Sequence, residues 1–404
     1  MTDEELEILA LRVSRRATEV NTKVLRDIGN MVKKIGDLRP TETHKLQQIL
    51  QNSNLTVKEI TDLISKFSGV SEKEIYDIYE NVAKEDYDFA EQFYKYRMID
   101  YVLFERKEEL QKTVKAIAKQ SKTTFDNLSN TTVFALKDFK GNVRYVPLEK
   151  AYKEVISKAI TLTQSGVTNY NTAIRNTLKQ YADSGIRNVE YESGYSRRLD
   201  TAIRQNIIDG VKQVHQEIQL ILGEEFRADG VEISVHDCCA EDHLPVQGRQ
   251  FENGEYDKLQ SNQSFKDYNG NKYTAIKRPI TQWNCRHFAF SIVLGASKPN
   301  HTNEDLAKIK KENEKKISIN GKEYTKYEAT QEQRRLETEI RKAKDRYTIF
   351  ESSGDDMMMN TTRKNITDLT RAYKQFSKEA NLKPRLERTT VYGYKKANMS
   401  SDLR

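Results

Sequence analysis

The chain has 404 residues, of which 37% are hydrophobic and 31% are charged, and its formal net charge is +7. This length allows two or three domains, and the high charged fraction favours long solvated helices over one compact globule. No apolar run approaches the roughly 20 residues that cross a bilayer, so the sequence predicts no membrane span. Three cysteines, two of them adjacent, exclude a disulfide framework. The chain also starts with acidic residues where a signal peptide would be basic, so we expect a soluble protein made in a cytosol.

Residues 1–122 are predicted to form an elongated helical N-terminal region. Apolar residues recur three and four positions apart, as the buried seam of one long helix requires: Leu6, Leu9, Val13, Ala17, Val20, Val24 and Ile28. Glycine and proline between Gly36 and Pro40 predict the end of that helix.

Two pairs with capping-box spacing mark further helix starts: Thr56 with Glu59, and Ser71 with Glu74. The stretch from Glu74 to Arg106 is rich in tyrosine and phenylalanine at helical spacing. Such stripes are more often packing surfaces than base-stacking platforms, so we interpret this one as core or partner interface.

Residues 123–300 are predicted to form a small α+β module. Gly141 and Asn142 indicate a turn into a short strand at 143–146, and helical patterns follow at 148–162, 170–181 and 196–222. Alternating apolar residues then predict strands at 231–235 and 288–294. These two strands would form a small sheet that carries the histidines and cysteines described below.

Residues 301–404 are predicted to form a basic C-terminal region. A helix to about Lys316 comes first, and Asn320-Gly321 between alternating segments then signals a β-hairpin. Two apolar seams, 336–350 and 366–380, predict an antiparallel helical hairpin, with Glu337 and Arg341 as a favourable pair on its outer face. The fold class is therefore mainly α with a small α+β module.

All three cysteines and three of the six histidines lie between His236 and His287. They form two short clusters joined by a connector rich in glycine, asparagine and aspartate. Zinc is bound by four nitrogen or sulfur ligands, which structural sites often draw as short pairs from two loops. The predicted ligands are His236, His243, Cys285 and His287, with Cys238 or Cys239 as alternatives. The histidines could equally be hydrogen-bonded anchors of the connector, and both readings stay open.

The alternative interpretation is a different class of function, a metal-dependent hydrolase or nuclease. His236, Asp237, His243, Asn284 and His287 include the residue types for a metal-assisted phosphodiester cut, and Cys285 with His243 could form a nucleophile pair. No nucleophile elbow, P-loop or H-E-x-x-H pattern strengthens this reading. Arg286 has two readings, a buried salt-bridge anchor or a contact with DNA.

The central stretch resembles the minor capsid protein 2 family of tailed bacteriophages, which is related to the Mu F-like head-morphogenesis proteins. The residues that carry the resemblance are Ser234-Val235-His236, His243, Gln247-Gly248-Arg249 with Phe251, and Asn284-Cys285-Arg286-His287. Gly321-Lys322-Glu323-Tyr324 adds to it, and the likeness extends from about Tyr195 to Lys344. Cys238 to Asp242 and Val246 depart from the family pattern.

The resemblance implies a structural virion protein, without enzymatic activity, made in the bacterial host cytoplasm. It would enter the phage head during assembly, with the portal protein and the major capsid protein as partners. Packaged DNA is a further candidate partner, because residues 301–404 contain 24 lysines and arginines against 17 acidic residues. The nine cations proposed for that contact are Lys308, Lys310, Lys311, Arg334, Arg335, Arg341, Lys342, Lys344 and Arg346.

Overall fold

The protein is mainly helical with several small antiparallel sheets, which confirms the predicted fold class. The computed structural model describes residues 3–36, 58–59, 62, 72–138, 140–164, 170–189, 195–236, 238–282 and 285–394. The folded chain divides into two compact units. Unit 1 comprises Met1–Ala10, Val70–Thr124 and Gln205–Glu332, and unit 2 comprises Leu11–Gly69, Phe125–Arg204 and Gln333–Arg404.

This division interleaves segments, whereas the sequence predicts consecutive domains at 1–122, 123–300 and 301–404. The consecutive division stays a prediction, because compactness in the folded chain does not test which segments fold alone. Among the helices of the described residues, none combines the length and apolar character that crossing a bilayer requires.

The long N-terminal helix is present as α1, Asp3–Gly36, and it ends at the predicted glycine. Its described seam residues Leu6, Val13, Ala17, Val20, Val24 and Ile28 are all buried. Thr56 and Ser71, the predicted caps, lie outside the described residues, although α3 begins at Glu72, directly after Ser71.

Three long helices, two of which continue into unit 2, form the main helical part of unit 1. They are α3 (Glu72–Arg97), α4 (Glu108–Asn130) and α7 (Leu199–Glu225), and the 3-10 turn η1 (Phe104–Arg106) precedes α4. The Tyr79 hydroxyl of α3 donates to Ser121 Oγ of α4 at 2.9 Å. A Cβ at Gly210 of α7 would lie 1.7 Å from the Tyr79 oxygen, so glycine is what lets α7 pack there. The stripe was predicted to be core or partner interface: Tyr79, Tyr87 and Tyr94 are buried in the core, whereas Phe89 and Tyr96 are exposed.

A three-stranded antiparallel sheet in the order β6-β5-β9 forms the β part of unit 1. Its strands are β5 (Gly230–Ile233), β6 (Gln250–Glu252) and β9 (Ala289–Ile292). The remaining elements are α8 (Asn253–Gln260), β7 (Phe265–Lys266), β8 (Lys272–Tyr273), α9 (Asn303–Glu314), β10 (Ile317–Ile319) and β11 (Lys322–Tyr324). The β10–β11 hairpin turns at Asn320-Gly321, both with positive φ, as predicted.

Unit 2 contains a four-stranded antiparallel sheet in the order β2-β1-β3-β4. Its strands are β1 (Thr132–Lys137), β2 (Val143–Pro147), β3 (Arg187–Val189) and β4 (Ser196–Arg198), and its connecting helices are α5 (Leu148–Gln164) and α6 (Tyr170–Ser184). Phe134 and Tyr181 pack edge to face in its core, with ring centroids 4.9 Å apart.

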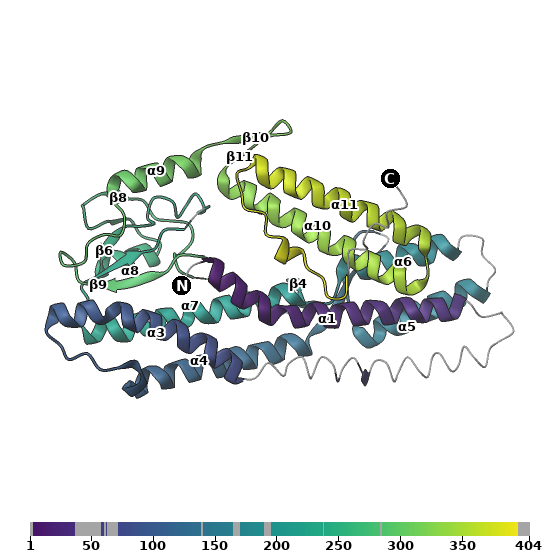
Figure 1. The fold of residues 1–404 in the computed structure, drawn as a ribbon, viewed down its shortest axis with the longest axis horizontal. Coiled ribbons are helices and arrows are strands. Elements are labelled where there is room, and N and C mark those ends of the chain that lie inside the picture. The colour runs from purple at the N-terminus through teal and green to yellow at the C-terminus, as the bar shows by residue number, and fades with distance from the viewer. Residues whose placement is uncertain are drawn as a thin grey trace, which may run out of the picture. The chain divides into compact units, whose positions relative to one another are not determined.

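The C-terminal helical hairpin is present as α10 (Lys326–Ser353) and α11 (Asp356–Glu379), which lie side by side and run in opposite directions (Figure 1). A 3-10 turn, η2 (Leu386–Thr389), follows them. Asp355 caps α11 by accepting a hydrogen bond from the Met358 amide at 3.1 Å.

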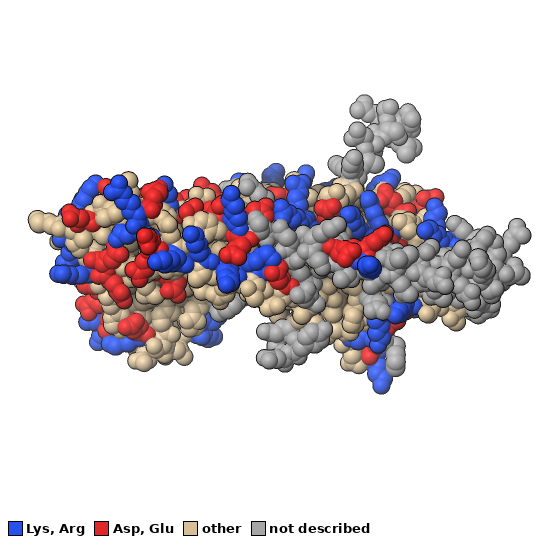
Figure 2. All heavy atoms as spheres, turned by 90° about the horizontal axis from the view of Figure 1, so that it is seen from below, with Lys and Arg blue, Asp and Glu red and all other residues tan. Residues whose placement is uncertain are grey.

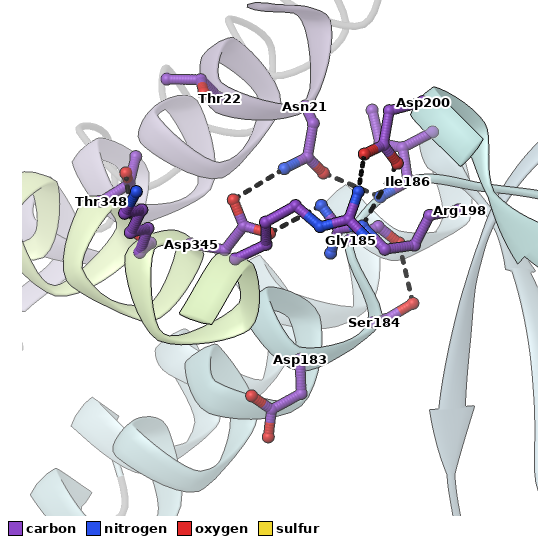
Figure 3. A network of polar contacts seen from close by, with 12 residues as sticks. Asn21, Thr22, Asp183, Ser184, Gly185, Ile186, Arg198, Asp200, Asp345 and Thr348 are labelled. Carbon is purple, nitrogen blue, oxygen red and sulfur yellow. Dashed lines mark hydrogen bonds and ion pairs between the residues drawn. The ribbon is translucent and has the colours of Figure 1, made fainter. Parts of the chain in front are cut away.

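A buried polar network connects four segments of unit 2 (Figure 3). Arg198 at the end of β4 donates to Asp345 of α10 at 2.9 Å and to Asp200 of α7 at 3.3 Å. Asn21 of α1 donates to Asp345 at 3.0 Å and accepts from the Ile186 amide at 2.8 Å. Each buried charge therefore has a partner, as burial of charge requires.

Three local predictions were incomplete or wrong. Residues 196–198 form strand β4 and the helix begins only at Leu199, because these residues pair with β3. Strand β1 was not predicted, although it pairs with the predicted β2. Glu337 is 4% exposed, not on an outer face, because Tyr373 donates to it at 3.0 Å and Arg388 of η2 lies 3.8 Å away.

Candidate metal centre

Strands β5 and β9 bring the two His/Cys clusters to one edge of the small sheet. The strands are antiparallel and Ile233 pairs with Ala289, so the loop that leaves β5 and the loop that enters β9 meet. The Ser234 amide donates to the Phe288 carbonyl at 2.8 Å, which continues the pairing one step further. The convergence of the two loops, predicted from the sequence, is present.

Three of the four predicted ligands come together. Cys285 Sγ lies 3.5 Å from His243 Nδ1 and 3.2 Å from His287 Nδ1, and the three ligand atoms lie within 4.8 Å of one another. All three side chains are buried. In a tetrahedral zinc site with bonds of about 2.0–2.3 Å, neighbouring ligand atoms are about 3.5 Å apart. The spacing of this trio fits such a site.

The outer hydrogen bonds of the two histidines orient their inner nitrogens. His243 Nε2 lies 2.9 Å from the Arg278 carbonyl, which can only accept, so Nε2 carries the proton. His287 Nε2 lies 3.3 Å from Gln247 Oε1, an oxygen whose position is fixed because it also accepts from the His236 amide at 3.2 Å. When both rings are neutral, the Nδ1 atoms of His243 and His287 both present a lone pair to the Cys285 thiol, which has only one proton to donate. A metal cation would bind both lone pairs, and the hydrogen bonds of the two Nε2 atoms are those expected of metal-binding histidines.

The electrostatics of the trio favour loss of a proton from the thiol. Burial raises the pKa of Cys285, but the hydrogen bonds to the His243 side chain and the His287 backbone, with the charges of His243 and Lys212, together leave that pKa below the ordinary value. Burial likewise lowers the pKa of His243, but the Cys285 contact, the hydrogen bond to the Arg278 carbonyl and the charge of Asp242 together raise it above the ordinary value. Burial and the neighbouring His236 and His243 lower the pKa of His287 to about 2, so that ring is neutral. A metal ion would take the place of the proton shared by Cys285 and His243.

The other predicted ligands lie around the trio. The His236 ring centroid is 5.0 Å from that of His287, and His236 is outside the group of three. Cys239 Sγ lies 3.4 Å from His287 Nε2, whereas Cys285 contacts Nδ1 of the same ring. Burial raises the pKa of Cys239 to about 12, which keeps it a thiol. Cys238 is half-buried with φ at +62°. The prediction of a metal site stays a prediction.

Burial weighs against the hydrolase reading of the same residues. Cys285 is 8% exposed and belongs to an apolar cluster with Ile233, Val246 and Phe251. A nucleophile has to reach the substrate, and this thiol is enclosed by aliphatic and aromatic side chains. Asp237 and Asn284, the other residues of that reading, lie outside the described residues.

Arg286, between two of the trio, is an anchor within unit 1. Its Nη2 donates at 2.6 Å to Glu7 Oε1, a carboxylate on the first turns of α1 whose residue is 3% exposed. This contact favours the salt-bridge reading of Arg286 over a contact with DNA.

His215 is a residue that the sequence analysis missed. Its Nδ1 lies 2.8 Å from Asp86 Oδ2 and its Nε2 lies 2.9 Å from the Ala289 carbonyl. These two contacts join α7 to α3 and to β9. The available signal was its position in the apolar seam of α7, between Val214 and Ile218.

Several cations of the C-terminal region are engaged inside unit 2. Arg341 donates to Asp200 at 2.6 Å, Arg346 pairs with Asp183, and Lys344 donates to the Thr389 carbonyl at 2.6 Å. Burial lowers the pKa of Lys344 to about 8. On the face drawn in Figure 2, basic and acidic side chains are interspersed. These three predicted DNA contacts therefore have structural roles.

The comparisons with known proteins give one match. A family model described as phage minor capsid protein 2 matches residues 1–378. No match was found among curated proteins, and none among solved structures.

Proposed function

The chain belongs to the phage minor capsid protein 2 family, and on this premise we propose that it is built into the phage head during assembly, in contact with the portal and major capsid proteins. It would be made in the cytoplasm of the bacterial host and carried in the virion. The observation that carries this proposal is the extent of the family match, which includes residues of both units and the whole His/Cys stretch. Family membership itself gives the protein a structural role in the phage particle.

Assembly with and without the portal protein tests the proposal. Heads assembled from the major capsid protein, the portal protein and this chain should contain it at a few copies per head, as quantified by mass spectrometry of purified particles. Heads assembled without the portal should contain much less. If the chain sediments apart from heads in both preparations, the proposal is wrong.

We propose further that His243, Cys285 and His287 bind one structural zinc ion in unit 1. The ion would join the loop after β5 to the segment before β9, a function that needs no substrate access and agrees with the burial of the trio. His236, whose ring adjoins that of His287, or Cys239 would supply the fourth ligand. On this proposal the cluster is structural and the protein has no catalytic activity.

Metal analysis of untagged protein, purified without chelator, tests the zinc proposal. We expect about one zinc per chain in the wild type and a large loss in the Cys285→Ser and His287→Asn variants. Cys238→Ser is the matched control, because Cys238 is a neighbouring cysteine outside the trio. Wild-type protein without stoichiometric metal, or a Cys285→Ser, His287→Asn double variant that keeps it, would show that the trio is only hydrogen-bonded.

Packaged DNA is a second partner that we propose, through helix α9. Lys308, Lys310 and Lys311 are exposed on that helix, whereas Arg341, Lys344 and Arg346 of α10 are half-buried and bonded within unit 2. Replacing all three by glutamate should weaken DNA binding by the full chain and reduce its dependence on salt, by up to about one logarithmic unit of slope per lost phosphate contact. Unchanged binding would exclude α9 from the contact.

A further inference from the structure

Arg286 connects the candidate metal centre to the first turns of α1. Cys285 and His287 meet in the trio, where Cys285 Sγ lies 3.2 Å from His287 Nδ1. Arg286, the residue between them, donates from Nη2 to Glu7 Oε1 at 2.6 Å. Three consecutive residues therefore make both contacts, and a movement of their backbone would disturb both.

Glu7 is a buried carboxylate, and Arg286 supplies it with a charged partner. Glu7 is 3% exposed, and its neighbours Leu6 and Ala10 on the same helix are also buried. Removing an ionised carboxylate from water is costly unless a cation or several hydrogen-bond donors accompany it. Loss of the contact with Arg286 would therefore favour release of these turns, in which Glu7 regains water.

The segment that carries Arg286 is fastened on both sides by hydrogen bonds. The Cys285 amide donates to the Gln282 carbonyl at 2.9 Å, and the Phe288 amide donates to Ser234 Oγ at 2.8 Å. Between these points, the trio is joined by contacts of 3.2–3.5 Å around a single thiol. A zinc ion would replace them by bonds of about 2.0–2.3 Å. Metal binding would thus restrain the backbone at Arg286 more firmly.

The part of α1 that Arg286 contacts belongs to unit 1. Met1–Ala10 is assigned to that unit and Leu11–Gly69 to unit 2, although α1 is one helix from Asp3 to Gly36. Hydrogen exchange in the first turns of α1 therefore reports on packing in unit 1. The later turns of the same helix provide an internal reference.

We propose that metal binding at the trio and docking of the first turns of α1 are thermodynamically coupled through Arg286. This inference rests on the zinc proposal above. A bound ion holds the segment 285–287 where Arg286 pairs with Glu7, and loss of the ion loosens the pair. Such coupling is reciprocal, so the docked helix raises the affinity for zinc by the factor by which zinc favours docking. Glu7, 279 positions from Arg286 along the chain, thereby contributes to metal affinity.

The zinc affinity of the full chain, measured by competition with a chromophoric chelator, tests the coupling. Glu7→Gln should weaken zinc binding at least about fivefold, since coupling between linked sites is usually of this size or larger. Glu5→Gln is the matched control, because it makes the same change at an exposed glutamate two positions earlier on the same helix. In an Arg286→Gln background, Glu7→Gln should have no further effect, because the connecting side chain is already absent.

Hydrogen exchange of the wild-type chain tests the reverse direction without a substitution. Removal of zinc should accelerate exchange at residues 5–10 of α1 and leave residues 18–28 unchanged. Unchanged exchange at residues 5–10 would overturn the coupling and leave the zinc site standing.

The variants have equally decisive outcomes. Zinc affinity that is unchanged in Glu7→Gln, or equally weakened in Glu5→Gln, would overturn the coupling alone. A loss that persists in the Arg286→Gln background would overturn the role of Arg286. A wild-type chain without stoichiometric zinc would overturn both this inference and the zinc proposal.

Discussion

Arg198 and Asp345 form a buried ion pair, with Nη2 and Oδ2 2.9 Å apart, although 147 positions separate them along the chain. Arg198 is 7% exposed and Asp345 is fully buried. The pair fixes β4 against α10 in unit 2, and the guanidinium lies under Gly185, where a Cβ would be 2.6 Å from Nη1.

Removal of Arg198 should strongly destabilise the protein. In Arg198→Ala, the carboxylate of Asp345 stays buried without its main partner, and such a loss costs roughly 3–5 kcal/mol of unfolding free energy. Denaturant unfolding of the full chain, followed by circular dichroism, measures the change. Arg144→Ala is the control, because Arg144 pairs with Glu154 at the surface and such pairs contribute about 1 kcal/mol or less. Equal losses in the two variants would contradict the role given to the network.

The stability of unit 2 should depend on the ionisation of Asp345. Burial raises the pKa of Asp345 to about 6, although Arg198 opposes the change. The folded protein therefore holds this proton more tightly than the unfolded chain does. The resulting contribution to the unfolding free energy is fully present below about pH 4. It is lost as the pH rises to about 6, a change of about 3 kcal/mol.

Asp345→Asn isolates that contribution, because asparagine stays neutral at every pH. The unfolding free energy of the wild type, minus that of the variant, should fall between pH 4 and pH 6 and be level above pH 7. If the difference instead rises over the same interval, the charges of Arg198 and Arg341 outweigh burial in setting the pKa of Asp345.

Gly210→Ala should destabilise unit 1 by roughly 1–3 kcal/mol, because the new Cβ would lie 1.7 Å from the Tyr79 hydroxyl oxygen. Thermal unfolding measures this loss. Tyr79→Phe removes the hydroxyl, so the double variant should lose less stability than the two single variants together. Gly254→Ala in α8 is the control, since nothing lies within 4 Å of its added Cβ and alanine favours a helix.

Removal of zinc should destabilise the loops of the candidate metal centre. A ligand present at 100 times its dissociation constant stabilises the folded state by about 2.7 kcal/mol, and a chelator would withdraw that contribution. Hydrogen exchange of the amides at 234–248 and 285–289 should accelerate on chelation, while exchange in α10 and α11 should not. If exchange is the same with and without chelator, the order of these loops does not depend on a bound metal.

The helical seams and the hairpin were predictable because their signals are local. Burial of every third or fourth residue of α1 follows from helix geometry alone, and Asn320-Gly321 requires positive φ at both positions. The convergence of His243, Cys285 and His287 was also accessible, since the two loops adjoin alternating segments that pair as strands.

What escaped prediction depends on contacts between distant segments. Glu337 reads as a surface residue from its helical spacing, but Arg388 and Tyr373 return to cover that side of α10. Residues 196–198 continue a helical pattern in the sequence, but in the structure they pair with β3 as a strand. The partners of His215 lie 129 and 74 positions away, and no local pattern specifies such distances.

The interleaving of the two units has a consequence for biosynthesis. Unit 2 draws on Gln333–Arg404, so the hydrophobic side of α1 emerges from the ribosome about three hundred residues before its last packing partners. Meanwhile, side chains such as Val20 and Val24 have to be shielded from aggregation by transient collapse or by a chaperone. Production of this protein should therefore be more sensitive to translation speed and temperature than its stability, once folded, would suggest.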